Sequence, residues 1–264
     1  STVIKYPEDL ILKLQSLELL ALNRRPRFIG FSNYLWNFNL ASSFAGWISK
    51  QYPEITLVFG GPNFPIDPDE QNEFLKEYDF IDYYISKEGE DAWLRLLGQP
   101  AEMVKLKSKS IAENVPNISF IDKTGIFCFS NVERMRDIRK LPSPYLSGDL
   151  DDFLDGRLLP TIQTNRGCPF TCTFCTEGQQ VWSLITKKDV ELLKSELNYI
   201  HSRIMALEPS RRRYDLLITD SNFGMYPEDV EIAEHIHALQ QETGWPKYIN
   251  VATGKNNKER VLHV

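Results

Sequence analysis

Short apolar segments alternate with amphipathic ones along most of this chain, and this alternation is the feature that most constrains its fold. The expected strands cover residues 27–32, 55–59, 81–85, 158–163, 214–220 and 249–253. The expected helices cover residues 8–22, 40–51, 70–78, 90–97, 187–205 and 229–241. Strands that alternate with helices at this pitch form βαβ units around a parallel sheet. The sequence therefore predicts an α/β fold.

One segment in the middle of the chain departs from the alternation. Two apolar stretches, residues 117–121 and 126–129, flank the turn-forming residues 122–125, which predicts a β-hairpin. Residues 139–145 contain two prolines and predict an extended connector that marks a domain boundary. The expected parts are an N-terminal domain over residues 1–112, the hairpin and connector over 113–150, and a second domain over 151–264.

Three of the four cysteines lie within eight residues of one another and follow a predicted strand. They are Cys168, Cys172 and Cys175, with the spacing C-x3-C-x2-C. A loop this short holds one inorganic centre, and cysteine thiolates are the usual ligands of iron–sulfur clusters. Three thiolates on a four-iron cubane leave one iron without a protein ligand. The motif therefore predicts a 4Fe-4S cluster with an open position for a substrate or cofactor.

Other roles for clustered cysteines fit the sequence less well. A structural zinc site needs four ligands, usually supplied as two pairs, and the chain has no second pair. Its remaining cysteine, Cys128, lies forty residues upstream in an apolar, strand-like stretch. The pattern also differs from the disulfide frameworks of secreted domains. Chance clustering and structural zinc remain the alternatives.

The cysteine motif and its flanking residues 165–170 resemble the radical S-adenosylmethionine (SAM) superfamily, whose motif follows the first strand of a (β/α) barrel. The resemblance implies that the three cysteines bind the cluster and that SAM chelates the open iron. One electron, supplied by an external donor such as flavodoxin or ferredoxin, then cleaves SAM to a 5′-deoxyadenosyl radical. Phe174, just before the third cysteine, would pack beside the SAM adenine. An ordinary core aromatic is the alternative for Phe174.

The resemblance also implies SAM-binding residues at the end of the second barrel strand. There, Asp220 and Asn222 would orient the SAM amino group, although either side chain could instead cap the loop before the following helix. Residues 151–264 supply only the first part of a partial (β/α) radical SAM barrel. We therefore expect the chain to be a fragment at both ends.

The N-terminal domain resembles the cobalamin-binding Rossmann-like domain that precedes many radical SAM barrels. The matching residues are Ser32 and Tyr34 at one strand end and Gly60 and Gly61 at the next. The resemblance places these residues along the nucleotide tail and corrin edge, at the strand ends where open α/β sheets bind ligands. A simple glycine turn in a domain that has kept no cofactor is the alternative. The family's first strand, and the histidine motif that some members use as an axial ligand, would fall before Ser1.

These features predict a radical SAM enzyme, with cobalamin-dependent methyl transfer to a small molecule or biosynthetic intermediate as the first hypothesis. Cyclisation or rearrangement is an alternative, and methylthiotransfer is disfavoured because no cysteine precedes Cys128. A Rossmann-type binding module with a structural metal loop is the non-enzyme alternative. The net charge of −6 argues against a nucleic-acid partner. Without a long apolar run or a signal sequence, we expect no membrane partner and a cytoplasmic location.

Overall fold

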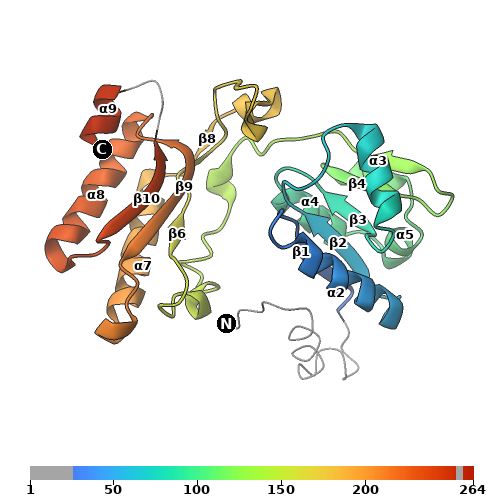
Figure 1. Ribbon diagram of the computed structural model, residues 1–264, viewed down its shortest axis with the longest axis horizontal. Coiled ribbons are helices and arrows are strands. Elements are labelled where there is room, and N and C mark those ends of the chain that lie inside the picture. Colours follow the sequence, from blue (N-terminus) through green and yellow to red (C-terminus); the bar gives the residue numbers. More distant parts are fainter. Residues whose placement is uncertain (1–25, 254–257) are drawn as a thin grey trace. The chain divides into compact units, whose positions relative to one another are not determined.

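The computed structural model describes residues 26–253 and 258–264, and it divides into two compact units with the boundary between Arg134 and Met135 (Figure 1). Both units are α/β, which confirms the predicted fold class. The helix predicted over residues 8–22 lies outside the described residues. Within the described part of the chain, no helix is long and apolar enough to cross a membrane.

The first unit is built on a five-stranded sheet in the order β1-β2-β3-β4-β5. Its strands are β1 (Phe28–Ser32), β2 (Thr56–Gly60), β3 (Tyr83–Ile85), β4 (Ile118–Ile121) and β5 (Phe127–Phe129). Its helices are α2 (Phe38–Gln51), α3 (Pro68–Glu77), α4 (Glu90–Leu97), α5 (Ala101–Lys105) and α6 (Ser110–Asn114). The first three strands are parallel, as predicted, and β4 and β5 form the predicted antiparallel hairpin.

The hairpin belongs to the sheet, because β4 pairs with β3 in antiparallel register, Ile85 opposite Ile118. The first compact unit therefore extends to Arg134, whereas the sequence placed the hairpin in a separate segment over residues 113–150. Local pattern predicts a hairpin but does not show which strand it will join. The division into functional domains at 112 and 150 stays a prediction.

Both faces of this sheet are covered by helices, which explains why its interior strand β2 is apolar on both faces. Alternate residues of β2 point to opposite faces. Leu57 and Phe59 join the cluster beneath α2 and α3, and Val58 joins the cluster beneath α4, α5 and α6. Cys128 is buried in the second of these clusters and is a core residue of the first unit.

The second unit contains a parallel three-stranded sheet in the order β10-β9-β6. Its strands are β6 (Thr161–Ile162), β9 (Asp215–Phe223) and β10 (Tyr248–Thr253), with a short antiparallel pair, β7 (Asn165–Arg166) and β8 (Thr186–Lys187). Its helices are α7 (Val190–Met205), α8 (Pro227–Thr243) and α9 (Lys258–His263). Short 3-10 turns cover Ile138–Lys140, Asp151–Phe153, Thr176–Gly178, Gln180–Ser183 and Pro209–Arg211.

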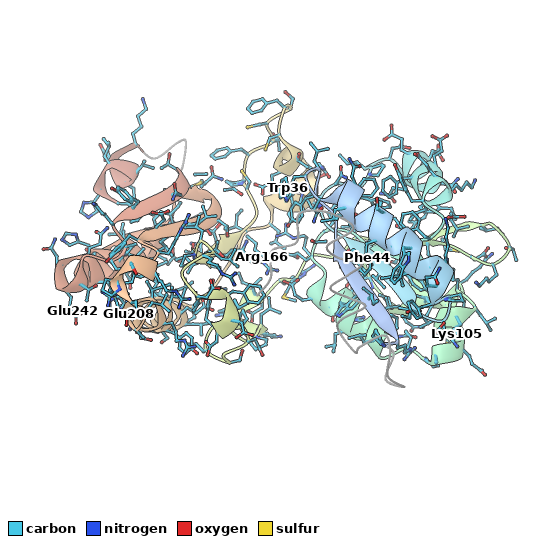
Figure 2. All side chains as sticks on the ribbon, turned by 60° about the horizontal axis from the view of Figure 1, so that its bottom comes forward. Trp36, Phe44, Lys105, Arg166, Glu208 and Glu242 are labelled. Carbon is cyan, nitrogen blue, oxygen red and sulfur yellow. The ribbon has the colours of Figure 1, made fainter. Side chains whose placement is uncertain are left out.

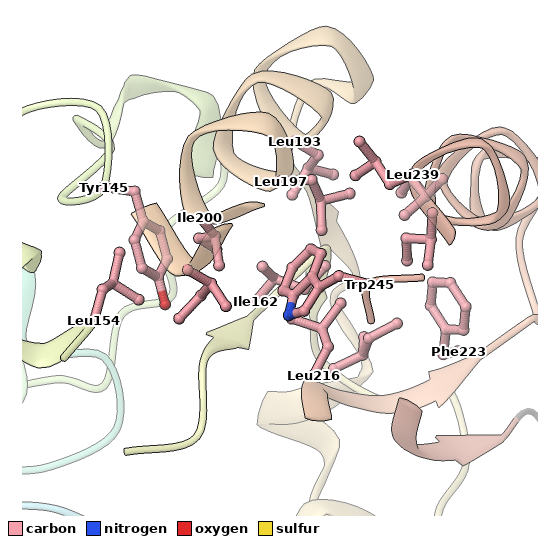
Figure 3. Close-up of a cluster of buried hydrophobic side chains, with 14 residues drawn as sticks. Tyr145, Leu154, Ile162, Leu193, Leu197, Ile200, Leu216, Phe223, Leu239 and Trp245 are labelled. Carbon is pink, nitrogen blue, oxygen red and sulfur yellow. The ribbon is translucent and has the colours of Figure 1, made fainter. Parts of the chain in front are cut away.

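The core of the second unit lies between this sheet and the helices α7 and α8 (Figure 3). Trp245 is fully buried at its centre, and its indole nitrogen donates a hydrogen bond to the carbonyl of Arg213 at 2.9 Å. Leu216 and Ile218 of β9 pack into the same cluster. The core therefore holds β9 in place, and β9 carries two of the predicted site residues, Asp220 and Asn222.

Candidate functional site

The cysteine loop follows β7 directly and presents its three thiols at different depths. Cys168 is buried, Cys172 is half-buried and Cys175 is exposed, and all three are free of disulfides. The Cys168 amide donates to the carbonyl of Trp182 at 2.9 Å, and the Cys175 amide donates to that of Cys172 at 3.1 Å. Backbone bonds thus shape the loop and leave the sulfurs available for an inorganic centre.

Two glycines make this loop shape possible. Gly167 has a φ of +101°, and a Cβ there would lie 2.5 Å from the carbonyl oxygen of Leu184. At Gly178 an added Cβ would lie 2.1 Å from the carbonyl oxygen of Cys172. No real side chain tolerates such approaches. The loop that carries the cysteines therefore depends on glycine at both positions.

Asp220 ties the segment before the loop to β9. Its carboxylate accepts hydrogen bonds from the Thr164 amide at 2.8 Å, from the Thr164 hydroxyl and from the Asn165 side-chain amide at 2.7 Å. Burial raises the Asp220 pKa to about 6, although these hydrogen bonds act in the opposite direction. Both carboxylate oxygens are engaged within the chain, so the geometry supports an anchoring role. A contact of Asp220 with the SAM amino group stays a prediction.

This raised pKa predicts a pH dependence of stability. Folded Asp220 holds its proton up to about pH 6, whereas in the unfolded chain it ionises near 3.8. The folded state therefore binds the proton more tightly, and the free energy of unfolding falls as the pH rises through this window. We expect chemical denaturation to show a loss of about 3 kcal/mol between pH 3 and 7 that is absent from Asp220→Asn. Asp215→Asn on the same strand should keep the loss; an unchanged slope in Asp220→Asn would contradict the prediction.

Asn222 lies beside the most buried of the three cysteines. Its side-chain nitrogen Nδ2 is 3.1 Å from the sulfur of Cys168, and Asn222 itself is 3% exposed. Its other polar atom, Oδ1, is buried and has no hydrogen-bond partner among the described residues. The predicted residues Cys168 and Asn222 are thus brought together, and the unpartnered oxygen fits a site that receives a polar ligand.

The opposite face of β9 carries a contact that the sequence did not reveal. Alternate residues of β9 point to opposite sides, so Ser221 faces away from Asp220 and Asn222. The Ser221 hydroxyl donates to the carboxylate of Glu177 in the cysteine loop. The position of Glu177, two residues after the last cysteine, is the only sequence signal that could have singled it out.

Phe174 is 87% exposed. The alternative that it is an ordinary core aromatic is therefore wrong. Phe174 and Cys175 are consecutive residues of the loop, and both are exposed. Packing against the SAM adenine stays a prediction.

No group of three His, Cys, Asp or Glu side chains among the described residues is placed to hold a single metal ion. A cubane cluster presents a separate iron to each thiolate, so its ligands need not converge on one atom. The features of the loop that bear on a cluster are therefore its three free thiols, the glycines Gly167 and Gly178, and the Asn222 amide beside Cys168.

In the first unit, the predicted cobalamin residues share one edge of the sheet. Ser32 and Gly60 are register partners at the ends of β1 and β2. Gly61 has a φ of +132°, and a Cβ there would lie 2.4 Å from the carbonyl oxygen of Asn33. Glycine at position 61 is therefore required by the chain's own packing, as the simple-turn alternative supposed. Cobalamin contact at Ser32, Tyr34, Gly60 and Gly61 stays a prediction.

An exposed aromatic group lies next to this edge. Tyr34 is partly exposed, and its ring stacks on that of Trp36 with the centroids 4.6 Å apart. Trp36 is 81% exposed and lies just ahead of the N-terminal end of α2 (Figure 2). Leu35 is exposed to a similar extent. Sequence reasoning missed Leu35 and Trp36; large apolar residues in a loop that follows a strand were the available signal.

The two units together define a class of fold. A Rossmann-like sheet, followed by a parallel βα sheet, is shared with solved cobalamin-binding radical SAM enzymes. The radical SAM methyltransferase TsrM from Kitasatospora setae matches 88% of this chain with 44% of its own length, at a TM-score of 0.60 and 15% identity. The cobalamin-dependent radical SAM enzyme OxsB, with aqua-cobalamin and SAM bound, matches 88% of the chain with 30% of its own, at a TM-score of 0.59 and 19% identity.

Curated relatives are similar in sequence as well. The chain is 30% identical to the 2-(S-pantetheinyl)-carbapenam-3-carboxylate methyltransferase of Streptantibioticus cattleyicolor over 245 residues. It is 29% identical to the cobalamin-dependent radical SAM methyltransferase TokK of Streptomyces tokunonensis over 245 residues. Each alignment covers 90% of this chain and 34% of the relative, so the chain spans about a third of their length. No family model matches the chain.

Proposed function

We propose that this chain is the cofactor-binding part of a cobalamin-dependent radical SAM methyltransferase. The observation that carries the proposal is the glycine-shaped loop that presents three free thiols beside the Asn222 amide. The relatives named above are methyltransferases, and this favours methyl transfer over the other radical reactions. The substrate class we propose is a small molecule.

Cys168, Cys172 and Cys175 are the proposed ligands of a 4Fe-4S cluster. When bound, the cluster and SAM supply the one-electron chemistry that starts the reaction. The chain's own residues shape and hold the site. Asp220 fixes the start of the loop against β9, and the unpartnered Oδ1 of Asn222 is an acceptor suited to the SAM amino group. Phe174 offers an exposed ring to the adenine.

The first unit is the proposed cobalamin-binding domain. Ser32, Gly60 and Gly61 form the sheet edge, and Tyr34 extends it with the exposed loop that contains Trp36. An open edge at the carboxyl ends of parallel strands is where α/β sheets bind their ligands. Exposed aromatic surface suits a large, flat and mostly apolar ring system such as a corrin.

Metal, corrinoid and SAM binding by the full-length protein tests this proposal. Anaerobic reconstitution should give about four irons per chain with broad visible absorbance, as a 4Fe-4S cluster requires. Added cobalamin should bind one per chain, and SAM should change the electron paramagnetic resonance (EPR) spectrum of the reduced cluster. A colourless protein that holds zinc and no corrinoid would overturn the proposal and support a binding module with a structural metal loop.

A further inference from the structure

We propose that Asn222 is a positioning residue that donates a hydrogen bond to the Cys168 sulfur and thereby raises the reduction potential of the cluster. This inference rests on the proposed function, because it needs a cluster bound at the three cysteines. It goes beyond that function by giving one side chain control over how readily the cluster accepts an electron.

The contact between Asn222 and Cys168 is short and buried from solvent. Nδ2 of Asn222 lies 3.1 Å from Sγ of Cys168, with Asn222 3% exposed and Cys168 7% exposed. A sulfur that binds iron can only accept a hydrogen bond, so the amide must direct its N–H toward it. The reversed amide would place an oxygen lone pair against a thiolate. Burial strengthens the interaction, because no water competes for either partner.

Donor and acceptor are held on two segments that Asp220 fastens together. Asp220 lies two residues before Asn222 on β9, and it binds Thr164 and Asn165 just ahead of Cys168. The strand itself is paired on both sides, with β6 and with β10. The amide therefore meets the sulfur without reorganisation when the cluster is reduced.

The direction of the effect follows from charge. One-electron reduction adds negative charge to the cluster and its sulfurs. An N–H dipole aimed at a ligand sulfur stabilises the reduced form more than the oxidised form, and such hydrogen bonds are among the factors that set cluster potentials. The electron comes from a one-electron reductant, for which dithionite serves in the test.

The test compares Asn222→Leu with the wild type in an anaerobic redox titration of the reconstituted protein, followed by EPR without SAM. Leucine keeps the branched shape and the number of side-chain heavy atoms and removes the donor. We expect the equilibrium constant for reduction to fall about ten-fold, which corresponds to a potential about 59 mV lower. Asn250→Leu makes the same chemical change at an exposed position of the neighbouring strand β10 and should leave the potential unchanged.

Each outcome has one meaning. A wild-type potential in Asn222→Leu with full iron content overturns this inference and leaves the proposed function standing. Loss of iron from Asn222→Leu assigns the residue to holding the loop and also overturns it. Absence of a cluster from the wild type overturns the proposed function itself. In wild-type protein with 15N-labelled asparagine, electron–nuclear double resonance should detect a weak 15N coupling that Asn222→Leu lacks; its absence contradicts the hydrogen bond.

Discussion

Replacing Cys172 with alanine is expected to abolish the iron–sulfur cluster. Two thiolates remain in that variant, and they leave a second iron of the cubane without a protein ligand. Iron after reconstitution should fall from about four per chain to well below one, and SAM cleavage should drop to background. Iron analysis and visible absorbance measure the first effect, and release of 5′-deoxyadenosine measures the second.

Cys128→Ala is the matched control for this change. It removes a thiol buried in the core of the first unit, far from the motif in sequence. Its iron content and absorbance should equal those of the wild type. Because Cys172 is half-buried, its own loss should cost little folding stability. Full iron and turnover in Cys172→Ala would remove the basis of the proposed function.

Replacing Gly167 with alanine should have the second-largest effect. The added Cβ would lie 2.5 Å from the Leu184 carbonyl oxygen and 2.7 Å from that of Trp182. Alanine also adopts a backbone φ of +101° only at a conformational cost of about 1–3 kcal/mol. The Cys168 amide donates a hydrogen bond to the Trp182 carbonyl, so a shift of that carbonyl displaces Cys168, the first of the proposed cluster ligands. We expect most of the bound iron to be lost and the free energy of unfolding to fall by about 3 kcal/mol or more.

Gly125→Ala separates backbone strain from steric overlap. Gly125 has a φ of +81° in the turn between β4 and β5, and an added Cβ meets no described atom within 4 Å. This variant should lose about 1 kcal/mol of stability and keep its iron. Equal iron content in Gly167→Ala and the wild type would show that the loop does not depend on glycine before the first cysteine.

The residues that the sequence identified best are those whose signal is local. Cys168, Cys172 and Cys175 lie within eight residues of one another, and a strand such as β2 shows its apolar pattern within five residues. The sequence missed the short pair β7 and β8, since each has only two residues and no periodicity to read. It also ended the strand at residue 220, whereas β9 continues to Phe223.

The candidate site was only partly predictable, since its partners are distant in sequence. Asp220 and Asn222 were expected near SAM, but nothing in the sequence indicated that one would bind Thr164 and the other Cys168. The contact of Glu177 with Ser221 was not foreseen for the same reason. The sequence also did not indicate which side chains would be exposed to solvent. Phe174 is exposed, although a buried position was equally consistent with the sequence.

By itself, the sequence determined the alternation of strands and helices and the spacing of the three cysteines, because periodicity and spacing are properties of neighbouring residues. Tertiary structure decided which side chains contact those cysteines. The parallel register that sets Ile162 opposite Ile218 brings the start of the cysteine loop alongside the end of β9. That register is fixed by packing against α7 and α8, an interaction between residues too far apart in the chain for any local pattern to encode.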